Sequence, residues 1–120
     1  MSIRVILAED NQSVRNAIVS LLKHHPEIEL IGAADSFEEM LRIVGETQPN
    51  LLLLDLHMKD ERTLVLSDFK ARLNAVPILA MSVWTDPETK ALAETLGAVQ
   101  LLDKASLGLE LVPAIRKHAK

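Results

Sequence analysis

The run of four leucines at positions 51–54, closed by Asp55, is the feature that most limits the fold. A strand with one face exposed to water alternates apolar and polar side chains, whereas a strand without polar residues has both faces buried. Such strands lie inside parallel sheets that carry helices on both sides. Residues 51–54 therefore predict a central strand of a parallel sheet, with Asp55 at its carboxyl end.

Short apolar runs and helix-period segments alternate along the rest of the chain. Four further strands are predicted at residues 3–8, 28–33, 77–81 and 98–102. Apolar residues at i, i+3, i+4 and i+7 predict helices between them. These helices are expected to begin near Asn11, Ser36, Asp60, Asp86 and Ser106, with Asp60 as the cap of the third. Gly97 is a natural residue to end the fourth helix, and Pro113 predicts a kink in the fifth or a delayed start.

Five strands alternating with five helices predict an α/β fold. Right-handed crossovers make it a doubly wound, five-stranded parallel sheet between two helical layers. No repeat, linker or low-complexity tract interrupts the pattern, so residues 1–120 are predicted to be a single domain. In such sheets the ligand site lies at the carboxyl ends of the strands.

Composition argues against several classes of function. The chain has no cysteine, which excludes disulfides and thiolate zinc sites and suits a reducing cytoplasm. Its apolar runs are far shorter than the roughly 20 residues of a membrane span, and no signal peptide is expected. A net charge of −4 and only three aromatic residues argue against direct nucleic-acid binding.

Polar residues with complementary chemistry end four of the predicted strands. They are Glu9 and Asp10, Asp55, Ser82 and, just past the fifth strand, Lys104. Each alone is explained as a helix cap, a turn residue or a solvated lysine. Three neighbouring carboxylates raise one another's pKa, and a divalent cation removes that repulsion. Oxygen ligands favour Mg²⁺ over zinc, so the set predicts a magnesium site.

These residue types suit phosphoryl transfer, in which a protein mainly positions groups and neutralises charge. Asp55 can act as the nucleophile and form an acyl phosphate. Ser82 can donate a hydrogen bond to one phosphoryl oxygen, and Lys104 can place its charge on another.

The chain resembles the receiver domains of bacterial two-component response regulators over essentially all of its length. The matching motifs are Glu9-Asp10, Asp55-Leu56-His57-Met58, Ser82, Gly97-Ala98 and Lys104. The resemblance implies a flavodoxin-like fold with strand order 2-1-3-4-5. It implies Mg²⁺ or Mn²⁺ bound by Glu9, Asp10, Asp55 and the backbone carbonyl of His57. It also implies that a sensor histidine kinase or phosphotransfer protein phosphorylates Asp55, which switches the conformation.

Residues 25–32 further resemble receivers that precede a DNA-binding domain of the LuxR/NarL type. This resemblance implies regulation of transcription in the bacterial cytoplasm, through a helix-turn-helix output domain outside this chain. A homodimer face is left open between the first and fifth helices and the surface from the fourth helix to the fifth.

The chain departs from the family pattern around the site. Lys59 and Thr63 stand where the family usually has proline and glycine, and Ala105 replaces a frequent proline after Lys104. Leu101 replaces the aromatic residue whose rotation usually reports phosphorylation. The switch that couples Ser82 to that aromatic position is therefore expected to be altered.

Two further residues, His57 and Trp84, lie two positions beyond Asp55 and Ser82. In receivers these positions flank the phosphoryl group. Together with Lys59 they are expected to tune the reaction, with Trp84 shielding the acyl phosphate from water or packing on the loop surface.

Two alternatives to a phosphorylated signalling module stay open. A degenerate receiver would bind partners without phosphorylation. A phosphatase of the haloacid dehalogenase type would need a second aspartate where His57 stands, and a substrate cap for which this chain has no room. The chain is therefore expected to be a signalling protein that catalyses only its own phosphorylation and dephosphorylation.

Overall fold

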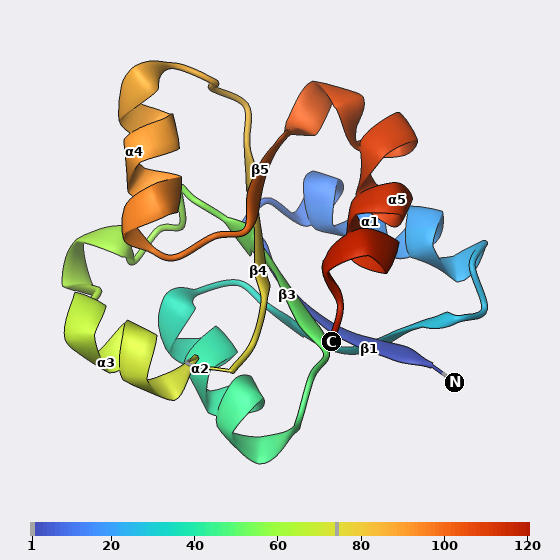
Figure 1. The fold of residues 1–120 in the computed structure, drawn as a ribbon, viewed down its shortest axis with the longest axis horizontal. Coiled ribbons are helices and arrows are strands. Elements are labelled where there is room, and N and C mark those ends of the chain that lie inside the picture. The colour runs from blue at the N-terminus through green and yellow to red at the C-terminus, as the bar shows by residue number, and fades with distance from the viewer. Residues whose placement is uncertain (1, 74) are drawn as a thin grey trace.

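A computed structural model describes residues 2–73 and 75–120. Five parallel strands form one sheet: β1 (Ile3–Ala8), β2 (Ile28–Ala34), β3 (Leu51–Asp55), β4 (Ile78–Ser82) and β5 (Gln100–Asp103). Their order across the sheet is β2-β1-β3-β4-β5 (Figure 1). This order confirms the predicted doubly wound sheet and the flavodoxin-like topology.

Helices cover both faces of the sheet. They are α1 (Gln12–Lys23), α2 (Phe37–Glu46), α3 (Leu66–Arg72), α4 (Pro87–Thr95) and α5 (Leu107–His118). Figure 1 shows α2, α3 and α4 on one side of the sheet and α1 with α5 on the other. None of the helices in the described residues has the length and apolar character that a membrane span requires.

The four leucines of β3 are fully buried and alternate between the two helical layers. Leu52 and Leu54 join the core beneath α2, α3 and α4, whereas Leu51 and Leu53 join the core beneath α1 and α5. A strand with helices on both faces needs apolar side chains at every position. The leucine run is thus explained by the central place of β3 in the sheet.

The predicted cap on the third helix is wrong. The Asp60 carboxylate accepts hydrogen bonds from the backbone N–H groups of Phe37 at 2.9 Å and Glu38 at 3.2 Å, in the first turn of α2. A 3₁₀ turn, η1 (Glu61–Thr63), follows it, and α3 begins only at Leu66 without a side-chain cap. The first N–H groups of a helix lack intrahelical acceptors, so α2 provides donors that draw in the Asp60 carboxylate.

The last strand begins two residues later than predicted. Gly97, with φ of 82°, ends α4, and the Ala98 N–H donates back to the Ala93 carbonyl at 3.0 Å. That bond holds Ala98 in the helix end instead of the sheet. The ladder contact begins at Val99, whose N–H donates to the Ile78 carbonyl at 2.8 Å.

Of the two effects predicted for Pro113, the delayed start of the fifth helix is wrong, and the kink stays a prediction. Helix α5 begins at Leu107, one residue after the predicted start, and continues through Pro113 in its interior. Proline there removes the donor for the carbonyl of Leu109. Leu109 itself is highly exposed.

Candidate functional site

The predicted polar residues follow strands that are neighbours in the sheet. Glu9 and Asp10 follow β1, Asp55 ends β3 and Ser82 ends β4. Lys104 begins a 3₁₀ turn, η2 (Lys104–Ser106), directly after β5. Because the order places β1, β3, β4 and β5 in succession, parallel pairing brings these ends to one edge of the sheet.

Three carboxyl groups gather at that edge. Oxygens of Glu9, Asp10 and Asp55 lie within 4.8 Å of one another, so they can bind one metal ion together. Glu9 is fully buried, Asp55 is 3% exposed and Asp10 is half-buried. The donor set contains only carboxylate oxygen, which suits Mg²⁺ or Mn²⁺ better than softer metals.

Lys104 provides the positive charge inside this acidic cluster. Its ammonium Nζ lies 2.6 Å from Glu9 Oε1 and 3.3 Å from Asp55 Oδ1, and its side chain is mostly buried. The sequence predicts Lys104 at this edge of the sheet, and the structure places its ammonium group between two carboxylates. A buried ammonium paired with two carboxylates reduces the repulsion between them.

Burial dominates the electrostatics of Glu9. Desolvation raises the pKa of the Glu9 carboxyl above its usual value, and the adjacent Asp55 raises it further. The hydrogen bond to Lys104 acts in the opposite direction without cancelling the effect. The raised pKa means that the ionised form of Glu9 is less favourable in the folded protein than in water.

Two residues at the N-terminal end of α1 donate hydrogen bonds to Glu9. The Asn11 N–H donates to Glu9 Oε2 at 3.2 Å, and Arg15 Nη1 donates to the Glu9 backbone carbonyl at 2.8 Å. The Asn11 side chain also caps α1 by accepting from the Val14 N–H at 3.0 Å. Sequence reasoning missed Arg15, although its place one helical turn after the Asn11 cap indicates that it can reach back to β1.

Asp55 and Ser82 are each bonded to the residue two positions ahead. Asp55 Oδ1 accepts from the His57 N–H at 3.1 Å, and Ser82 Oγ accepts from the Trp84 N–H at 3.0 Å. Ser82 is fully buried. The loops after β3 and β4 are therefore tied to the two side chains for which phosphoryl chemistry was predicted.

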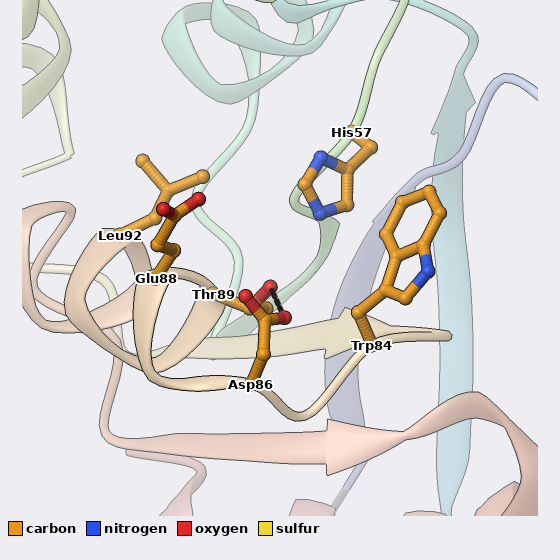
Figure 2. Close-up of a pocket in the computed structure, with 6 residues that line it drawn as sticks. All are labelled: His57, Trp84, Asp86, Glu88, Thr89 and Leu92. Atoms are coloured by element: carbon orange, nitrogen blue, oxygen red, sulfur yellow. Dashed lines mark hydrogen bonds between the residues drawn. The ribbon is translucent and has the colours of Figure 1, made fainter.

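The rings of His57 and Trp84, two residues beyond Asp55 and Ser82, contact each other. Their ring centroids are 4.8 Å apart and the rings are nearly perpendicular, at 85°. They line a cavity of about 410 Å³ with residues from the start of α4 (Figure 2). Figure 2 shows the indole and imidazole above the hydrogen bond that links Asp86 to Thr89. Trp84 is 56% exposed, so it packs at the loop surface and forms one wall of this cavity.

The departures from the family pattern have local contacts of their own. Lys59 Nζ forms an ion pair with Asp35 at 3.2 Å. Leu101 is partly buried against the core beneath α2, α3 and α4. The Ala105 N–H donates to Asp103 Oδ1 at 2.9 Å, and each peptide bond in the described residues is trans.

Comparison with known proteins decides the family. The family model of the response regulator receiver domain matches residues 5–116, nearly the whole chain. This chain belongs to the response regulator receiver family.

Named relatives of this receiver include regulators of transcription. It is 30% identical to the transcriptional regulatory protein LiaR of Bacillus subtilis over 98% of its own length and 56% of LiaR. It is 29% identical to the DNA-binding transcriptional activator DevR/DosR of Mycobacterium tuberculosis, over 95% of this chain and 53% of that protein. The receiver thus spans about half the length of these LuxR/NarL-type relatives.

Solved structures confirm the receiver fold. The signal receiver domain of the putative response regulator NarL from Mycobacterium tuberculosis superposes with a TM-score of 0.85 at 24% identity. The match covers 97% of this chain and 94% of that one. The acidic cluster of Glu9, Asp10 and Asp55 is consistent with the phosphoacceptor site of such a receiver.

Proposed function

We propose that Asp55 accepts a phosphoryl group from the phosphohistidine of a sensor kinase or phosphotransfer protein. The observation that carries the proposal is the buried Asp55 carboxylate, which shares its pocket with two carboxylates and an ammonium group. An Asp55 oxygen attacks phosphorus while the phosphorus–nitrogen bond of the donor breaks. The electron pair of that bond stays on the imidazole, and Asp55 becomes an acyl phosphate.

A divalent cation completes the proposed site. The carboxylates of Glu9, Asp10 and Asp55 and the backbone carbonyl of His57 would hold Mg²⁺ or Mn²⁺. When bound, the ion supplies positive charge that offsets repulsion between the carboxylates and the phosphoryl oxygens. The all-oxygen donor set within 4.8 Å supports this part of the proposal.

Lys104 and Ser82 would bind the phosphoryl oxygens. Lys104 already contacts Asp55, so a short shift of its ammonium reaches a phosphoryl oxygen on that residue. Ser82 would turn its hydroxyl from the Trp84 N–H toward another oxygen, as a donor. Release of the Trp84 N–H would then pass the change to the start of α4, a route that does not need an aromatic residue at position 101.

The walls of the cavity are proposed to tune the lifetime of the acyl phosphate. The rings of His57 and Trp84 contact each other. Lys59 adds a positive charge to the loop after β3, which also carries His57. Bulky rings in these positions would limit the approach of water to phosphorus.

An apolar groove beside Lys104 suits the phosphodonor. It has a volume of about 480 Å³ and is lined mainly by α1, together with Val83 and Leu107. Such a groove accepts the apolar face of a helix. A donor helix bound there would bring its phosphohistidine close to Lys104 and Asp55.

The output is proposed to lie outside residues 1–120, which would act as a single receiver domain. The relatives named above are DNA-binding or transcriptional regulators roughly twice as long as this chain. They support a helix-turn-helix output domain that regulates transcription in the bacterial cytoplasm. The receiver itself, with a net charge of −4, is not proposed to bind nucleic acid. A homodimer would assemble through α1 and α5 or through the α4–α5 surface.

Intact mass tests the phosphoacceptor directly. The chain is incubated with Mg²⁺ and acetyl phosphate, beside Asp55→Asn and a matched surface control, Asp68→Asn, on α3. We expect one added phosphoryl group in the wild type and in Asp68→Asn, and none in Asp55→Asn or with EDTA present. Asn preserves the shape of the Asp55 side chain but removes the nucleophilic carboxylate.

Two other results would overturn this function. The absence of an adduct on the wild type would favour a degenerate receiver that acts without phosphorylation. Steady release of phosphate over many turnovers would favour a phosphatase, although His57 stands where that class needs its second aspartate.

A further inference from the structure

The loop between β3 and α3 is fastened to the start of α2 by two consecutive residues. Asp60 accepts from the N–H groups of Phe37 and Glu38 at 2.9 and 3.2 Å. Lys59 forms its ion pair with Asp35, just before α2, at 3.2 Å. These contacts join segments more than 20 residues apart, so the loop is held by tertiary contacts as well as by its own conformation.

The two carboxylate oxygens of Asp60 serve donors that α2 cannot satisfy by itself. The side chain of the local cap, Ser36, accepts through Oγ from the Glu39 N–H, at 3.2 Å. The N–H groups of Phe37 and Glu38 therefore depend on Asp60. A carboxylate at this end of a helix also interacts favourably with the helix dipole. Helix α2 thus has one cap from its own segment and one from the phosphoacceptor loop.

The other end of the same loop touches the phosphoacceptor. The His57 N–H donates to Asp55 Oδ1 at 3.1 Å, and only two residues separate His57 from Asp60. The side chain of Met58, between them, is buried at 2% exposure. A short segment fixed at both ends leaves the His57 peptide little freedom to move.

We infer that Asp60 is a positioning residue for the phosphoacceptor site. By holding the loop against α2, it sets the orientation of the His57 backbone beside Asp55. Side-chain contacts of Lys59 and Asp60 hold the loop against the segment that begins α2. Thr63 adds a contact within the loop, because its hydroxyl donates to the Asp60 carbonyl at 2.9 Å. This inference rests on the proposed function of Asp55.

Ser36→Ala is a matched control for Asp60→Ala. Both substitutions remove a side-chain cap from the same end of α2, so both are expected to lower the thermal midpoint. Only Asp60→Ala also frees the loop that carries His57. Any difference between the two at Asp55 therefore reports positioning rather than the stability of α2.

The first measurement needs neither metal nor phosphate. Hydrogen exchange of the His57 amide is followed by NMR in EDTA for the wild type, Ser36→Ala, Asp60→Ala and Asp60→Asn. We expect about tenfold faster exchange in Asp60→Ala and an unchanged rate in Ser36→Ala. Asp60→Asn keeps one acceptor oxygen, so its rate should fall between those of the wild type and Asp60→Ala.

The second measurement is the affinity for Mg²⁺, followed through the emission of Trp84, the single tryptophan of the chain. We expect Kd to rise about tenfold in Asp60→Ala, because residues that orient a metal ligand typically change metal affinity by at least this factor when they are removed. In Ser36→Ala, Kd should stay unchanged. Equal effects of Asp60→Ala and Ser36→Ala in both measurements would overturn the inference. A wild type that forms no acyl phosphate would instead overturn the proposed function, while the exchange rates still report on the loop.

Discussion

The carboxyl group of Glu9 has no contact with solvent, yet it lies in a site that gathers negative charge. Lys104 compensates this charge only in part, and the pKa of the Glu9 carboxyl stays above its usual value. A group in this condition lowers the stability of the folded protein when it is ionised. Glu9 is therefore retained at a cost in stability, which is common for residues of functional sites.

This cost makes a prediction about pH. The unfolded chain loses the Glu9 proton near pH 4.5, whereas the folded chain keeps it to higher pH. Within that window the folded state binds more protons, so raising the pH destabilises it. Relative to Glu9→Gln, the wild type should lose stability as pH rises from 4.5 to 7.5 in EDTA. Urea unfolding of both proteins measures the difference, and a gain with rising pH would contradict the raised pKa.

At the level of helices and strands, two glycines differ in what their backbone requires. One follows helix α4, and the other lies inside helix α2. Gly97 ends α4 with a φ of 82°, a conformation that side chains with Cβ atoms rarely adopt. Gly45 lies inside α2, and a Cβ added there would meet no atom within 4 Å. The backbone conformation, rather than the space available, therefore decides what a substitution does.

Alanine at these two positions should change stability with opposite signs. Gly97→Ala places a side chain in the left-handed region and should destabilise the protein by about 1–2 kcal/mol. Gly45→Ala gains helix propensity and should stabilise it by about 0.5–1 kcal/mol. Urea unfolding gives both values. A stabilising Gly97→Ala would show that α4 ends in another conformation.

Local sequence signals explain which elements were predicted well. The leucine run at 51–54 indicates a buried strand because every side chain in it is apolar. Gly97 indicates the end of a helix because glycine readily adopts a positive φ. Both signals depend on residue type alone and can therefore be read from the sequence. The Asp60 contact could not be predicted, because its donors are backbone groups of Phe37 and Glu38, which every residue except proline also provides. Arg15 also bonds to a backbone group, the Glu9 carbonyl, and its place one helical turn after the Asn11 cap is the one signal that pointed to it. The acidic residues and Lys104 were found because side-chain chemistry at strand ends is visible in the sequence.

At the scale of the whole molecule, the sheet separates two apolar cores. One lies beneath α2, α3 and α4, and the other beneath α1 and α5. Phe69 is fully buried in the first, where its ring meets Phe37 edge to face at 6.2 Å between centroids. Large aromatic side chains in such places contribute much of the apolar burial of a small domain.

Loss of that ring should remove a large part of the total stability. Phe69→Ala leaves a cavity and should cost about 3–5 kcal/mol, against the 5–15 kcal/mol typical of a folded domain. Leu109→Ala, at a highly exposed position of α5, should change the free energy of unfolding by less than about 0.5 kcal/mol. Urea unfolding compares them. Similar losses would mean that α3 contributes little to the core.

The alternation of the β3 leucines between the two cores also has a consequence for how the protein can change. Leu52 and Leu54 face one helical layer, and Leu51 and Leu53 face the other. A side chain that is substituted in one core therefore contacts few side chains of the other core. Energetic effects of substitutions that share no neighbours add. Each helical layer can therefore accumulate substitutions on its own, and a chimaera could exchange α1 and α5 for those of another receiver while the α2–α4 layer stays as it is.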